Sequence, residues 1–204
     1  MVVDNFEQQW HHHPNPEVDI AVMPLLPIID GIRSQGKEPF YKAIPHTLIP
    51  SPEQLQELDA IEEVVFFGYP NGMYDSHNLT PVARRGYTAT PLQLDYDGNP
   101  TFLIDASVFP GSSGSPVLIY NPGPYSANGT LVLGGTRVLF LGVLAEVMIQ
   151  DDEGTIDFIS VPTRQMPIIR TRQMIDLGLV YKSTLVTEAV LDFLKLRNLI
   201  PKTV

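Results

Sequence analysis

A serine-rich turn is the part of the chain best suited to carry out chemistry. Residues 110–116 read Pro-Gly-Ser-Ser-Gly-Ser-Pro, with apolar runs on both sides at 101–109 and 117–120. The glycines let the backbone bend, so that the N–H groups of Gly111 and Ser113 can converge on one point. There they would stabilise the negative charge that develops on the oxygen of a reacting carbonyl. The segment is therefore a candidate acyl-transfer site, and a simple glycine–serine hairpin turn is the alternative.

Four segments of the chain resemble trypsin-like serine peptidases, which share the chymotrypsin fold. Residues 110–116 resemble the Gly-Asn/Asp-Ser-Gly-Gly-Pro signature, although Ser115 stands where the family has its second glycine. The run Glu17-Val-Asp-Ile-Ala-Val-Met-Pro-Leu25 resembles the one that carries the catalytic aspartate in the bacterial HtrA (Deg) group. Residues 64–72 and 84–90 resemble the first two strands of the second barrel. Without this context, an acid before a strand would simply mark an exposed strand end.

The resemblance implies a role for each matching residue. Ser113 would be the nucleophile, and Asp19, which lies 94 residues earlier, would orient the catalytic histidine. The backbone N–H groups of Gly111 and Ser113 would form the oxyanion hole. Ser107 would lie at the base of the substrate pocket and, being uncharged, would favour uncharged side chains. The pocket wall would be formed by Gly142, Val143, Leu144 and Ala145, on the strand that lies along the bound substrate.

The histidine that such a site needs has no good candidate. His11, His12 and His13 lie too close to Asp19 for a hairpin to intervene, whereas His46 and His77 follow it and break the family order of His, Asp, Ser. We therefore expect either an N-terminally truncated peptidase or a degenerate relative, with poor activity as the chain stands. The alternative function is a non-catalytic module that binds peptides or other proteins and retains the peptidase fold.

The strand pattern predicts an all-β, chymotrypsin-like antiparallel barrel. After residue 60 the strand-like runs are 63–69, 83–92, 101–107, 115–121, 130–148 and 155–162, enough for one complete barrel. Before residue 60 only 18–25 and 39–45 qualify, so the first barrel would be incomplete. This predicts a barrel remnant and linker at 1–60, a C-terminal barrel at 61–182 and a helical segment at 183–204.

Finer features of the sequence complete this prediction. The helix would be capped by Thr187 and stopped by Pro201. Turns are expected at 71–72, 97–99, 134–135 and 150–154.

Composition restricts the partners. The formal net charge of −10 argues against nucleic acid and against an anionic membrane surface. No apolar run approaches the length of about 20 residues that spans a bilayer. The chain has no cysteine, which excludes a fold held by disulfides and permits a reducing compartment.

We expect a peptide or protein substrate, no cofactor and no metal. Strand edges left uncovered would favour self-association. The location would be cytoplasmic if the N-terminus is genuine, while export stays open for a truncated chain.

Overall fold

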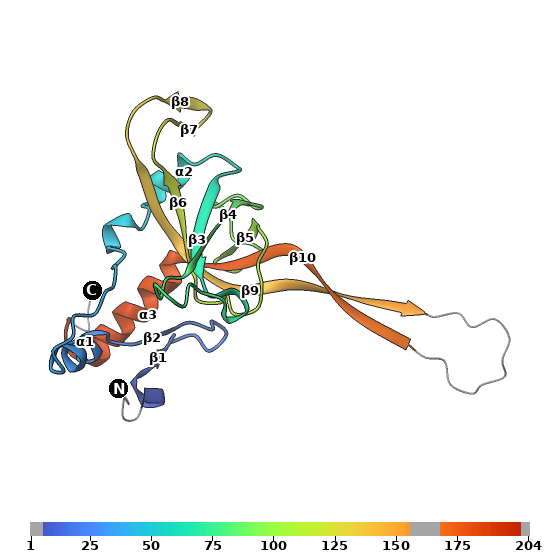
Figure 1. Cartoon of the computed structure of the whole chain (residues 1–204). Coiled ribbons are helices and arrows are strands. Elements are labelled where there is room, and N and C mark those ends of the chain that lie inside the picture. The colour runs from blue at the N-terminus through green and yellow to red at the C-terminus, as the bar shows by residue number, and fades with distance from the viewer. Residues whose placement is uncertain (1–5, 156–167, 201–204) are drawn as a thin grey trace, which may run out of the picture.

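A closed six-stranded antiparallel barrel dominates the computed structural model, which describes residues 6–155 and 168–200 (Figure 1). Around the ring the strands follow the order β10-β5-β4-β3-β6-β9. Because β6 returns to lie beside β3, strands β3 to β6 form a Greek key. The six strands are β3 (Glu63–Gly68), β4 (Val82–Thr88), β5 (Thr101–Asp105), β6 (Pro116–Asn121), β9 (Arg137–Thr155) and β10 (Ile168–Lys182).

The barrel interior is a single apolar cluster. Alternate residues of β3 point inward, and Val64 and Phe66 are fully buried there, as period-two patterning requires. Strand β5 is buried along almost its whole length. The other fully buried apolar side chains of the cluster are Phe102, Ile104, Val108, Val117, Ile119, Leu144 and Val180.

Two further elements lie outside the ring. Strands β7 (Tyr125–Ala127) and β8 (Thr130–Val132) form a small hairpin between β6 and β9. Helix α3 (Ser183–Leu196) follows β10 directly and buries Leu185 and Ala189. These two residues pack with Ile20, and Val143 and Tyr181 lie against the same cluster.

The N-terminal segment, residues 6–62, lies beside the barrel and α3 and contains little regular structure (Figure 1). After a 3-10 helix (Phe6–Gln9), β1 (His11–His12) pairs with β2 (Ala21–Val22). Helices α1 (Leu26–Arg33) and α2 (Pro52–Gln56) follow, the second with a capping box at Ser51. A second 3-10 helix, His46–Leu48, lies between α1 and α2.

Most of the strands after residue 60 agree with the sequence-based prediction, and the all-β barrel with a C-terminal helix is confirmed. The N-terminal strands agree less well. The predicted strand 18–25 shrinks to Ala21–Val22, and 39–45 forms no strand. The division into domains at residues 60 and 182 stays a prediction.

The closing strand of the barrel was not predicted. Leu177 to Tyr181 of β10 pair with Asp105 to Thr101 of β5 and complete the ring. A glycine inside a strand usually weakens the strand signal, and here Gly178 faces the core, where a Cβ would lie 2.8 Å from Val108 Cγ2. The predicted run 155–162 only touches the end of β9, and its remainder lies outside the described residues.

Two local predictions are wrong. Residues 150–154 form no turn, because β9 continues through them in register with β10, and the two strands project from the barrel as a long ribbon (Figure 1). Thr187 does not cap α3, because the helix begins at Ser183 and the Thr187 hydroxyl donates to the Ser183 carbonyl at 2.9 Å. The turns at 71–72 and 97–99 are present, with positive φ at Asn71, Gly72, Asp97 and Gly98.

Candidate functional site

The serine-rich loop joins β5 to β6 and exposes one of its three serines. Ser113 is solvent-exposed and lies in a tight turn, whereas Ser112 and Ser115 are buried. This is the position that the sequence predicts for Ser113. Its role as a nucleophile stays a prediction, because a turn presents a hydroxyl without activating it.

The backbone N–H groups of the loop divide into two sets. Ser112 donates to the Phe109 carbonyl at 3.1 Å, Ser115 to the Ser112 carbonyl at 3.1 Å, and Gly114 to the Leu144 carbonyl at 2.7 Å. Among the described residues, the N–H groups of Gly111 and Ser113 have no such acceptor. These are the two groups that the sequence assigns to an oxyanion hole, and that role stays a prediction.

Strand β9 holds the loop on one side. Besides accepting the bond from Gly114, Leu144 donates its own N–H to the Ser115 carbonyl at 2.9 Å. The Leu144 side chain is buried in the barrel, so this attachment is anchored in the core. The predicted pocket wall, residues 142–145, is thus bonded directly to the serine loop.

Close backbone packing fixes the other side of the loop. Asn71 donates its N–H to the Pro110 carbonyl at 2.7 Å, and Gly111 lies over the Tyr69 carbonyl with a φ of +84°. A Cβ at Gly111 would come within 2.9 Å of that carbonyl oxygen. A glycine is therefore needed here for both conformation and space.

Arg84 on β4 holds the serine-rich loop in place through hydrogen bonds. Its guanidinium donates to the Ser107 carbonyl at 2.7 Å and to the Ser112 hydroxyl at 2.6 Å, and it stacks on the Phe66 ring at 4.5 Å. Burial lowers the pKa of Arg84 from its ordinary value, and no carboxylate pairs with this guanidinium among the described residues. From the sequence, Arg84 is predicted only to lie in a strand. The sequence signal for this contact is limited to a basic residue within a predicted strand, and only the structure shows that this residue is half-buried.

Ser107, the predicted base of the substrate pocket, is exposed while its carbonyl is bound by Arg84. In the predicted wall, Gly142 and Leu144 are buried, whereas Val143 and Ala145 are half-buried. A Cβ at Gly142 would lie 1.8 Å from the Tyr181 carbonyl oxygen, so only glycine allows β9 and β10 to approach as they do.

Asp19 is brought near this region from the N-terminal segment. Its backbone N–H donates to the Tyr181 hydroxyl at 3.3 Å, and Tyr181 pairs with Val143 of the predicted wall. The Asp19 carboxylate is exposed and has no bonding partner among the described residues. No contact joins Asp19 to Ser113 in that part of the chain.

The histidines have other partners or lie exposed. His11 Nε2 is 2.8 Å from the Asp192 carboxylate on α3, and His13 accepts the Asn15 N–H at Nδ1. His12, His46 and His77 are exposed. Within residues 6–155 and 168–200, no histidine bonds to Ser113, and no group of three or more histidine and acidic side chains is arranged to hold a metal.

Comparison with family models, curated proteins and solved structures finds no match to this chain. No helix of the described residues is both long and apolar enough to cross a membrane.

Proposed function

We propose that the chain carries the nucleophile-bearing barrel of a trypsin-like serine endopeptidase. The observation that carries this proposal is the division of N–H groups in the 110–116 loop. The two predicted oxyanion donors, at Gly111 and Ser113, are free while their three neighbours are paired. Unpaired N–H groups at the base of an exposed serine are what acyl transfer requires.

The architecture supports the same proposal at a coarser level. The family places its active site between two six-stranded barrels, and one closed six-stranded antiparallel barrel is present here. The loop that would carry the nucleophile is anchored to the core through Leu144 and clamped by Arg84. A rigid support of this kind keeps catalytic groups in place.

In the proposed mechanism, the Ser113 hydroxyl attacks the carbonyl carbon of a peptide bond. The N–H groups of Gly111 and Ser113 stabilise the resulting oxyanion, and a base accepts the hydroxyl proton and later delivers it to the leaving amine. Asp19, with its free carboxylate, would orient that base. The described residues supply no histidine to Ser113, so this chain by itself retains only the contributions of the hole and of binding, about 10³–10⁴-fold over water.

For specificity, we propose a preference for uncharged side chains at P1. Ser107 contributes no charge, and the Arg84 guanidinium bound to its carbonyl adds positive charge beneath the loop. A substrate lysine or arginine would therefore be repelled rather than paired.

A base-rescue labelling experiment tests the proposal. The full chain is incubated with a fluorophosphonate, with and without imidazole as an external base, and the modified serine is identified by mass spectrometry. We expect slow labelling of Ser113 that imidazole accelerates, no labelling after Ser113→Ala, and unchanged labelling after Ser76→Ala, a matched exposed serine on another loop. Equal labelling of Ser76 and Ser113 would contradict the proposal.

The partners of the histidines favour one second candidate, a peptide-binding module without catalysis. His11 bonds to Asp192 on α3 and His13 accepts a bond from Asn15, and in the described part of the chain neither histidine bonds to Ser113 to take its proton. For such a module, imidazole would leave the labelling rate of Ser113 unchanged.

A further inference from the structure

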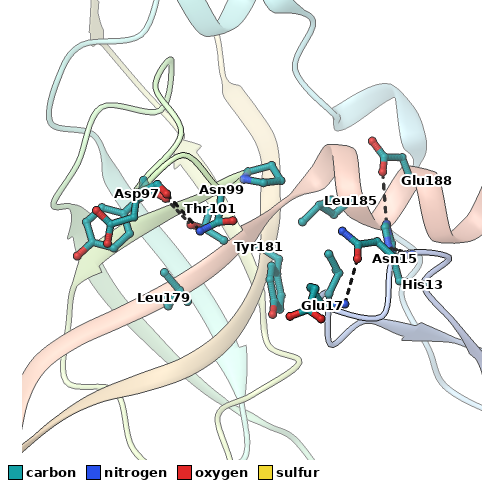
Figure 2. A pocket seen from close by; sticks show the side chains of 13 residues that line it. His13, Asn15, Glu17, Asp97, Asn99, Thr101, Leu179, Tyr181, Leu185 and Glu188 are labelled. Carbon is teal, nitrogen blue, oxygen red and sulfur yellow. Dashed lines mark hydrogen bonds and ion pairs between the residues drawn. The ribbon is translucent and has the colours of Figure 1, made fainter.

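A cavity of about 620 Å³ opens between the N-terminal segment, the turn before β5, strand β10 and helix α3 (Figure 2). Its lining carries three carboxylates, from Glu17, Asp97 and Glu188, and no lysine or arginine side chain. Leu179 and Leu185 contribute apolar surface to the same lining. The volume is within the range of small-ligand sites. The arrangement suits a cation with an aliphatic stem.

His13 provides a second, independent sign of a ligand. Its Nδ1 accepts the Asn15 N–H at 3.1 Å, so a neutral ring carries its proton on Nε2. The side chain is only 2% exposed, and Nε2 has no hydrogen-bond partner within the described part of the chain. Glu188 Oε2 lies 3.4 Å away, within ion-pair distance (the dashed line in Figure 2) but without the geometry of a hydrogen bond. A buried donor left in this state costs free energy until an acceptor reaches it.

The Glu188 carboxylate, which lies over His13, can rotate away from the imidazole ring. The Glu188 side chain is 59% exposed on the surface of α3 (Figure 2). An incoming cation would draw Glu188 toward itself and leave His13 Nε2–H to an oxygen of the ligand. The ligand therefore needs an alkylammonium group and, a short distance from it, an uncharged acceptor.

We infer that this cavity binds a peptide segment through a lysine side chain. The ammonium is attracted by the carboxylates that line the cavity (Glu17, Asp97 and Glu188), the methylene stem packs on the apolar surface of Leu179 and Leu185, and a main-chain carbonyl accepts the His13 proton. A free diamine shares the cation but not the carbonyl. A bare metal ion does not fit, because no set of three histidine or acidic side chains in the described residues is arranged to hold one. The inference stands independently of any chemistry at Ser113.

Titration of the ¹⁵N-labelled full chain by NMR tests this inference. The probe is N-acetyl-lysine methylamide, with N-acetyl-norleucine methylamide as the uncharged match and 1,5-diaminopentane as the cation without a carbonyl. We expect saturable shifts centred on the amides of Asn15 and Thr101. The norleucine compound should bind at least about tenfold more weakly, and the diamine several-fold more weakly. Added salt should weaken the lysine compound, because partly exposed charges are screened.

Isosteric variants locate the site. Glu188→Gln and Asp97→Asn should each weaken the lysine compound about two- to fivefold, as expected for partly exposed charge pairs. Glu7→Gln removes an exposed acid outside the cavity and should change nothing, and Ser113→Ala should leave binding intact. Equal binding of the lysine and norleucine compounds would overturn the inference. Diamine binding as tight as that of the lysine compound would overturn the peptide assignment, since the carbonyl would then contribute nothing.

Discussion

The barrel and the N-terminal segment both contain many apolar residues, but they bury them very differently. The barrel gathers its apolar side chains into one cluster, and ring closure pairs both edges of every strand there. The N-terminal segment leaves Leu26 62% exposed and Phe40 98% exposed, and its strands β1 and β2 are two residues long. Closure therefore makes the barrel self-sufficient, whereas the segment depends on what it touches.

The N-terminal segment packs mainly against helix α3. Ile20 packs with Leu185 and Ala189 in a second, smaller cluster, and His11 bonds to Asp192 on the same helix. Near its end, Leu58 joins the barrel core. The comparison predicts that changes in the barrel cost global stability, and that equivalent changes in the segment cost far less.

The largest expected effect comes from adding one methyl group at a barrel glycine. In Gly142→Ala the new Cβ would lie 1.8 Å from a backbone oxygen of Tyr181, so the paired strands β9 and β10 would have to move apart. We expect a loss of at least about 3 kcal/mol in the free energy of unfolding, or failure to fold, because overpacking against backbone has no side-chain remedy.

The matched control lies in the segment. Gly36 has a φ of +74° but open space around its Cβ position, so Gly36→Ala should cost only about 1–2 kcal/mol. Urea denaturation of both variants measures the difference. Equal losses would show that the segment is as tightly determined as the barrel.

The next effect concerns two isoleucines of similar burial. Ile119 in β6 is fully buried within the barrel cluster, and Ile29 in α1 is 6% exposed but belongs to neither cluster. Ile119→Ala should cost about 2–5 kcal/mol, because the surrounding core cannot collapse into the space. Ile29→Ala should cost less, toward the lower end of that range, because Ile29 belongs to neither apolar cluster and the cost depends on how well the site can collapse.

Hydrogen exchange checks the same pair. Ile119→Ala should raise the exchange rates of amides throughout the barrel, while Ile29→Ala should change only amides of the N-terminal segment. Faster amide exchange throughout the barrel in the Ile29→Ala variant would contradict the expected difference between the two regions.

The same contrast explains what could be predicted from the sequence. Barrel strands such as β3 show alternation, because one side of each strand must face the core. Strand β10 was not predicted, because Gly178 occupies an inward-facing position where a side chain would not fit and so interrupts the apolar pattern. Strand β2 was predicted too long, because Leu25 continues the apolar run in the sequence but stays exposed as the N-cap residue of α1.

For the candidate site, sequence located the exposed Ser113 and the two free N–H groups, which follow from local glycine conformations. It could not locate Arg84 beneath the loop, because that contact spans 28 residues and depends on strand register. The cavity around His13 could not be located from the sequence for the same reason. Its walls come from four separate parts of the chain.

The smallest expected effect lies at the boundary of the two regions, at Asp59. Hydrogen bonds from the Ser126 hydroxyl, first, and from the Gly129 N–H lower the pKa of this carboxyl below its ordinary value of 3.8. A depressed pKa means that the folded state favours the charged carboxylate, so the stabilisation is present above pH 3.8 and is lost as pH falls through the folded pKa. We expect the Gly129 amide shift to titrate with a midpoint below 3.8, while the barrel stays folded. Asp59→Asn should abolish that titration and spare the His77 amide, which bonds to Asp75. A Gly129 midpoint above 3.8 would contradict the lowered pKa of Asp59. A barrel that unfolds in step with Asp59 would show that this contact is part of the cooperative core.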